Sequence, residues 1–139
     1  MTSRFVADSS MAIAWVVPSQ SSPASQRLHE EIESGSRFLV PQLWFFEVAN
    51  TLLTLARRRK ITDREHSLAR HYLNQLGAMV DEEGCPFALG PIVDIADRYS
   101  LSVYDATYLE LSLRRHLPLA ARDAALNRAA KAAGIVTLS

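Results

Sequence analysis

The stretch Arg4-Phe5-Val6-Ala7-Asp8-Ser9-Ser10 decides the fold, because a short run typical of a buried strand stops at an acid. The two serines after that acid can cap an apolar helix, which Pro18 then ends. A second apolar stretch, Phe38 to Val40, stops in the same way at Pro41. Short buried strands that alternate with helices predict a parallel sheet covered by helices on both faces.

The rest of the chain continues this alternation. We expect helices at about 25–34, 43–59, 62–76, 91–99, 103–115 and 123–133, and strands at 78–80, 117–121 and 135–137. The predicted class is α/β, a three-layer α/β/α sandwich with a central, mainly parallel sheet of four to five strands. A length of 139 residues fits one domain, which we place at 1–139.

Composition excludes several classes of protein. A hydrophobic fraction of 48% and a charged fraction of 22% are typical of globular chains and argue against disorder. Net charge is zero, so any attraction to nucleic acid must come from a local patch. Cys85 is the single cysteine, which excludes an internal disulfide. The longest apolar stretch, 11–17, is too short to cross a membrane, and we expect a cytoplasmic protein.

Four acids fall where strands end or helices begin. Asp8 follows the first strand, Asp123 follows the fourth, and Glu47 and Asp105 lie in the first turns of two helices. Ligands of open parallel sheets bind outside the carboxyl ends of the strands. The four carboxylates are therefore expected to meet at one edge of the sheet.

Taken singly, each acid also has a purely structural explanation. Asp8 and Asp123 can cap the helices that follow, and Asp105 can complete a capping box with Ser102. Glu47 fits this explanation least, because its neighbours from Leu43 to Val48 are apolar and acids are seldom buried without a partner.

A metal ion would explain the set as a whole. Carboxylates that share a pocket repel one another, and a hard divalent cation with oxygen ligands relieves that repulsion. Mg²⁺, or Mn²⁺ in its place, can promote hydrolysis of a phosphodiester. No histidine is needed, and the four present are interpreted as structural or solvent-facing: His29, His66, His71 and His116.

The ordered set of acids resembles the PIN-domain nucleases, and among them the small VapC-type toxins of toxin–antitoxin pairs. The resemblance covers essentially the whole chain and rests on four segments: Asp8-Ser9-Ser10, Glu47-Val48-Ala49-Asn50, Tyr104-Asp105-Ala106-Thr107-Tyr108-Leu109 and Ala121-Arg122-Asp123. It implies a Mg²⁺- or Mn²⁺-dependent endoribonuclease that leaves a 5′-phosphate and a 3′-hydroxyl. A co-transcribed antitoxin would silence it, and a homodimer is expected.

The resemblance also implies roles for individual residues. Asp8 and Asp105 would be the primary metal ligands, and Glu47 and Asp123 would complete the acidic cluster. Ser10 would supply the hydroxyl after the first acid. Asn50, one turn after Glu47, would face the same pocket. Ala121 departs from the family pattern, because many relatives carry a hydroxyl residue there.

Other features allow two interpretations each. Arg57-Arg58-Arg59-Lys60 is a solvated helix end or a contact to the RNA backbone, and Arg114-Arg115 allows the same pair. Trp44, Phe45 and Phe46 are expected in the core. Family members, however, often bind the antitoxin in an apolar groove near this helix.

Two other functions fit parts of the sequence. A phosphotransfer domain also has an acid after its first strand, but it needs a second acid where this chain has Ser10. A catalytically silent binding module would keep the fold and bind no metal.

Overall fold

The structure, a computed structural model, describes residues 3–139 and has one central sheet of four parallel strands. In spatial order the strands are β3 (Met79–Asp81), β2 (Arg37–Pro41), β1 (Arg4–Ala7) and β4 (Leu119–Ala120). Phe5 pairs with Phe38 in the register between β1 and β2. The central strand β1 is therefore flanked on both sides, and Asp8 leaves it in the middle of the sheet.

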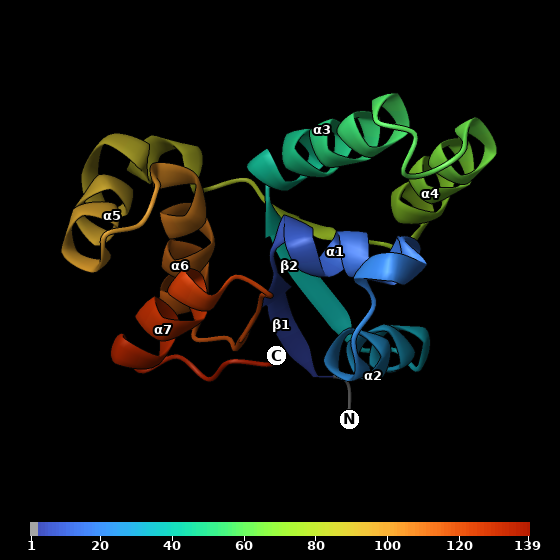
Figure 1. The fold of residues 1–139 in the computed structure, drawn as a ribbon. Helices are drawn as coiled ribbons and strands as arrows, with labels where there is room; N and C mark the ends of the chain where they lie inside the picture. The colour runs from blue at the N-terminus through green and yellow to red at the C-terminus, as the bar shows by residue number, and fades with distance from the viewer. Residues whose placement is uncertain (1–2) are drawn as a thin grey trace.

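Helices cover both faces of this sheet (Figure 1). One layer holds α1 (Ser9–Val16), α2 (Pro23–Glu33), α3 (Leu43–Arg57) and α4 (Asp63–Gln75). The other layer holds α5 (Val93–Tyr99), α6 (Val103–Arg115) and α7 (Ala124–Ala132). The predicted parallel α/β architecture is confirmed.

The last predicted strand is shorter than expected. Residues 135–137 form no full strand and make one parallel bridge, between Thr137 and Leu119. The fourth strand itself has two residues rather than the predicted five. Gly134, with φ at +85°, follows α7, and the Ile135 amide donates to the Ala130 carbonyl of that helix at 2.8 Å, so the start of the predicted strand is used to close the helix.

The helix predicted at 91–99 begins differently. A π-helical turn, Ala88–Ile92, precedes α5, and inside it Gly90 has the non-helical angles φ −127° and ψ −109°. Pro91 follows that kink and lacks an amide hydrogen to donate, so a regular α-helix starts only at Val93.

The aromatic residues of α3 are only partly in the core. Trp44 is 1% exposed and lies on the same side of the helix as Val48 and Leu52, four and eight residues on. Phe45 and Phe46 point away from that side and are 38% and 75% exposed, so the prediction that they are core residues was wrong. One face of α3 packs on the protein, and the other presents aromatic surface to solvent.

Helix ends follow their local sequence, with one correction. Asp8, rather than Ser9 or Ser10, is the N-cap of α1 and accepts the Met11 amide. The predicted capping box between Thr62 and Glu65 is present at the start of α4. Among the described residues, no helix combines the length and the apolar character needed to span a bilayer.

Candidate functional site

Asp8 is buried at the carboxyl end of β1, with 5% of the residue exposed. Its Oδ1 accepts the Met11 amide at 3.0 Å, and its own amide donates to the Ala120 carbonyl of β4 at 3.0 Å. Burial raises the pKa of Asp8 to about 6, and the charges of Asp105 and Glu47 add to the rise. The hydrogen bonds from Met11 and Ser10 act against it. Asp8 is thus a carboxylate whose charge is poorly compensated.

Ser10 connects the two strand ends that carry acids. Its hydroxyl lies 2.8 and 2.9 Å from the two carboxylate oxygens of Asp8, to which it donates. The same oxygen accepts the amide of Arg122 at 3.2 Å. The hydroxyl therefore ties the turn after β1 to the segment that leads from β4 to Asp123.

Glu47 lies half-buried on α3 and is held by α6. The Tyr108 hydroxyl donates to Glu47 Oε1 at 2.5 Å. Tyr108 is itself 1% exposed, and its pKa is raised mainly by burial and further by Glu47. The phenol therefore stays protonated and keeps its donor role across the physiological range.

Asp105 lies half-buried in the first turn of α6, where its amide donates to Ser102 Oγ at 3.0 Å. Burial raises the pKa of Asp105, and the negative charges of Asp123 and Glu47 raise it further. The structure thus brings Asp8, Glu47 and Asp105 into mutual electrostatic range. Three elements distant in sequence supply them.

Asp123 is the most exposed of the four acids and is the N-cap of α7. Its Oδ2 accepts the Leu126 amide at 2.8 Å. Ala121, which lacks the hydroxyl of many relatives, is fully buried, and its carbonyl accepts the Asn127 side-chain amide at 2.9 Å. Asn127 and Ser10 together hold this turn. The negative charge of Asp123 contributes to the raised pKa of Asp105, which links Asp123 electrostatically to the other acids.

Asn50 is exposed on α3, and no hydrogen bond joins its side chain to the acids within residues 3–139. The proposed supporting role of Asn50 therefore gains nothing from the structure.

The donor chemistry of the cluster fits a hard divalent cation. All of its donors are carboxylate oxygens, and the pKa values of Asp8 and Asp105 are raised mainly by burial and further by the neighbouring acids. Across residues 3–139, however, no group of three His, Cys, Asp or Glu side chains is arranged so that it could hold a metal ion.

Two features were missed by the sequence analysis. Tyr108 received no role, although its position three residues after Asp105 places both on one face of α6. The second is an ion cluster in which Arg114 donates to Asp81 at 2.7 Å and to Glu110 at 2.7 Å. The interpretation of Arg114 as a solvated residue was wrong, and its contact with RNA stays a prediction. The spacing of four residues between Glu110 and Arg114 on α6 was a local signal for their ion pair. The contact of Arg114 with Asp81 joins distant segments, and no local pattern could have revealed it.

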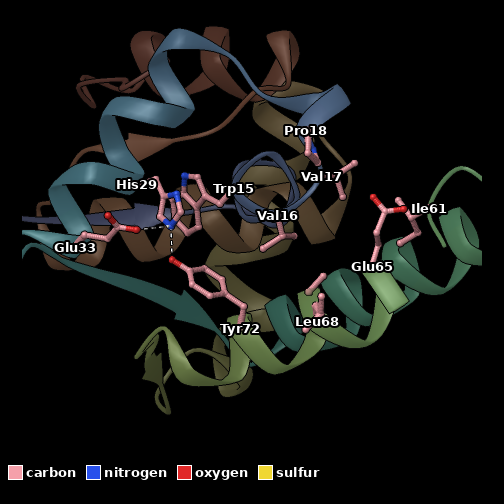
Figure 2. Close-up of a pocket in the computed structure, with 11 residues that line it drawn as sticks. Trp15, Val16, Val17, Pro18, His29, Glu33, Ile61, Glu65, Leu68 and Tyr72 are labelled. Atoms are coloured by element: carbon pink, nitrogen blue, oxygen red, sulfur yellow. Dashed lines mark hydrogen bonds and ion pairs between the residues drawn. The ribbon is translucent and has the colours of Figure 1, made fainter. Parts of the chain in front are cut away.

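A second surface feature lies away from the acids. Figure 2 shows a groove between the end of α1, α2 and α4, with a volume of 390 Å³. The floor of the groove is mainly apolar, Leu68 lies at its exposed rim, and a carboxylate lies at either side. The floor residues are Trp15, Val16, Val17, Ile61, Ala69 and Tyr72, and the carboxylates are those of Glu33 and Glu65. His29 stacks on Trp15 and hydrogen-bonds the Tyr72 hydroxyl, so it is half-buried here.

Solved structures share this fold. PAE2754 from Pyrobaculum aerophilum superimposes with a TM-score of 0.74 at 20% identity, over 99% of this chain and 91% of that one. VapBC2 from Rickettsia felis, bound to a DNA fragment from their promoter, gives a TM-score of 0.65 at 9% identity and 96% coverage of both chains. A toxin–antitoxin complex from Klebsiella pneumoniae gives 0.57 at 14% identity and 86% coverage of both.

Sequence comparison identifies the family. No curated protein sequence matches this chain. The family model described as PIN domain matches residues 5–132, a span that contains all four acids of the candidate site. Because this match covers most of the chain, the protein belongs to the PIN domain family.

Proposed function

We propose that this protein is a metal-dependent endoribonuclease and the toxin of a type II toxin–antitoxin pair, acting in the cytoplasm. The observation that carries the proposal is the mutual approach of Asp8, Glu47 and Asp105 at the carboxyl edge of the sheet, with the pKa of two of them raised.

Each residue has a proposed part in RNA hydrolysis. Asp8 and Asp105 would hold Mg²⁺ or Mn²⁺ directly, with Glu47 and Asp123 completing the negative cluster. When bound, the metal supplies electrophilic stabilisation of the phosphodiester and lowers the pKa of water. Tyr108 fixes the orientation of the Glu47 carboxylate through its hydrogen bond. Ser10 would orient the Asp8 carboxylate in the same way, through its own hydrogen bond. Asn50, exposed on α3, remains a candidate supporting residue of the site.

The test is cleavage of single-stranded RNA with Mn²⁺ or Mg²⁺, with EDTA, and with the Asp8→Asn and Asp105→Asn variants. We expect products with a 5′-phosphate and a 3′-hydroxyl, and loss of cleavage in EDTA and in both variants. Asp97→Asn is the matched control, because Asp97 is an exposed acid on α5 whose charge contributes to the pKa shift of neither Asp8 nor Asp105. Full activity of Asp8→Asn would contradict the proposal.

Calorimetry distinguishes the proposed nuclease from the alternative, a catalytically silent binding module. The nuclease predicts Mn²⁺ binding by the wild-type chain and its loss in Asp8→Asn. A silent module predicts no heat of Mn²⁺ binding at millimolar concentration and no RNA cleavage under any metal condition.

The apolar groove in Figure 2 is suited to binding a protein partner, which we propose is the antitoxin. The similar structures from Rickettsia felis and Klebsiella pneumoniae are complexes by their descriptions. The apolar floor fits an apolar segment of the partner, and Glu33 and Glu65 would attract basic side chains that flank that segment.

Leu68→Glu tests the groove, because Leu68 is 54% exposed at its rim and can accept a charge without unfolding the core. We expect weaker antitoxin binding and unchanged RNA cleavage. Val136→Glu is the matched control, since Val136 is an exposed apolar residue that does not line the groove. Equal antitoxin affinity of both variants would place the antitoxin elsewhere.

A homodimer is also proposed. Exposed apolar side chains occur at the start of α3 and near α5 and α6, with Phe46, Leu89 and Tyr104 the most exposed. Phe46→Ser is expected to shift the mass in solution toward the monomer, whereas Val136→Ser should leave it unchanged. A wild-type monomer at tens of micromolar would contradict the dimer.

A further inference from the structure

Four consecutive cations occupy the turn between α3 and α4, and we call Arg57, Arg58, Arg59 and Lys60 the basic turn. All of them are exposed. Arg57, Arg59 and Lys60 line a cavity of 510 Å³ that the start of α4 closes. Because the net charge of the chain is zero, such a patch is a local excess of positive charge.

The basic turn is not neutralised by the rest of the described chain. The ion pairs within residues 3–139 involve only His29 and Arg114 as cations, and Arg114 alone contacts three acids. Asp63 and Glu65 line the cavity too, so its three cations exceed its acids by one, and neither acid forms an ion pair with the basic turn. Glu65 Oε1 accepts the Thr62 amide at 2.8 Å, which lowers the pKa of Glu65. The cations are therefore available to an external anion.

Helix stability does not account for the whole turn. Arg57 is in the last turn of α3, where a cation favours the helix dipole, but Arg59 and Lys60 lie beyond the helix. The Lys60 amide donates to the Leu55 carbonyl at 2.8 Å and the Arg59 amide to the Ala56 carbonyl at 3.1 Å. At this end of α3 the Arg59 backbone has φ at +57°, a conformation that costs glycine less free energy than arginine.

The position of the basic turn relative to the acids suggests its ligand. Glu47 and Arg57 lie on the same helix ten residues apart, which at 1.5 Å per residue is about 15 Å. A stacked strand with a phosphate roughly every 3.4 Å covers that distance in about four nucleotides. Figure 1 shows α3 and α4 side by side, with the basic turn at the end of α3 remote from the sheet.

We infer that the basic turn is a backbone-phosphate subsite, which holds single-stranded RNA about four nucleotides from the bond that is cut. This inference rests on the proposed ribonuclease function and adds a second contact to it. The subsite reads charge and not base identity, so it contributes affinity and position along the strand. RNA that is too short to extend from the acids to the basic turn gains no affinity from the subsite.

The first test compares two double variants with matched charge. Arg57→Gln with Lys60→Gln removes two cations from the basic turn. Arg128→Gln with Lys131→Gln removes two exposed cations from α7, one of them also in the last turn of its helix. Affinity for an RNA of about twelve nucleotides is measured in EDTA by fluorescence anisotropy, between roughly 50 and 200 mM salt.

Each phosphate contact contributes about 0.7 to the slope of log affinity against log salt for single strands. The basic-turn variant should therefore lose about 1.4 from the wild-type slope, whereas the α7 variant should keep it. A trinucleotide should bind all three proteins alike. Equal slopes for the wild type and the basic-turn variant, or an equal loss in the α7 variant, would overturn the inference.

The second test separates RNA binding from folding. Arg59→Gly should raise the melting temperature by a few degrees and yet weaken RNA binding. His116→Gly relieves the same type of backbone strain, φ +54° at the end of α6, and should raise the melting temperature with no change in RNA affinity. Stronger or equal RNA binding by Arg59→Gly would overturn the inference.

The two proposals can fail separately. If the wild type cleaves RNA with Mn²⁺ and the basic-turn variant has an unchanged KM on the long RNA, the subsite is refuted and the nuclease stands. If the wild type cleaves nothing but the slopes differ as expected, the nuclease is refuted, and the binding of RNA phosphates by the basic turn stands without a distance to a cleaved bond.

Discussion

Asp8→Asn is expected to make the metal-free protein more stable at pH 8, although it removes a residue of the proposed active site. The carboxylate is buried, and its pKa is raised from 3.8 to about 6. At 1.36 kcal/mol per pKa unit, the ionised form costs roughly 3 kcal/mol in the folded state. Asparagine is as good an N-cap as aspartate, so the hydrogen bond from the Met11 amide can remain.

The sign of the pH dependence follows from the raised pKa. Below pH 3.8 the carboxyl is protonated in both the folded and the unfolded chain, and the penalty is absent. The penalty grows as pH rises through 3.8 and is complete above about 6. We therefore expect Asp8→Asn to exceed the wild type by about 3 kcal/mol at pH 8, on the order of 10 °C in melting temperature, and by about 1 kcal/mol at pH 4.5.

Bound metal should make the wild type more stable than Asp8→Asn at pH 8. An ion at about 1,000 times its dissociation constant stabilises the folded protein by about 4.1 kcal/mol, which exceeds the roughly 3 kcal/mol penalty, and only the wild type should gain this. Thermal unfolding is followed by circular dichroism at both pH values, in EDTA and in Mn²⁺, with Asp97→Asn as the control for removal of an exposed charge. An Asp8→Asn protein that is no more stable than the wild type at pH 8 in EDTA would refute the reasoning.

Further predictions concern the residues that support the site and the fold. Arg114→Ala should destabilise the protein by about 3–5 kcal/mol in urea unfolding, because it leaves the buried carboxylates of Asp81 and Glu110 unpaired; an effect under 1 kcal/mol would contradict the cluster. The pKa of Asp81 is lowered mainly by its hydrogen bond with Arg114, so this stabilisation is present above pH 3.8 and should disappear as pH falls through the lower folded value, which acid titration of the wild type can measure. Tyr108→Phe removes the donor to half-buried Glu47 and should cost about 1 kcal/mol; kcat should fall with little change in KM, and unchanged kcat would show that the hydrogen bond does not orient the carboxylate.

One rule of parallel sheets was enough to predict that the acids lie close together. Asp8 ends the central strand, and the acids that follow other strands or open the next helices are brought to the same edge. That rule needs only the order of elements. It does not need side-chain packing, which a single sequence does not reveal.

Glu47 lies near Asp8 and Asp105, as predicted, but one premise of that prediction was wrong. The segment around it was expected to be buried, yet Phe45 and Phe46 are exposed. What holds the Glu47 carboxylate is the Tyr108 hydroxyl, 61 residues further along the chain. Contacts of this range depend on how α6 packs beside α3, which helix periodicity leaves open.

The contrast between two buried acids at the same edge of the sheet gives the strongest physical reason to assign a metal ion to one of them. Asp81 ends β3 and faces the guanidinium of Arg114, which lowers its pKa. Asp8 follows β1, and the groups that shift its pKa include two further acids and no cation. The chain neutralises the acid that serves the fold and leaves the other uncompensated, at a cost to stability. Such a cost is expected where an external cation completes the charge balance, and it can be measured before any RNA is added.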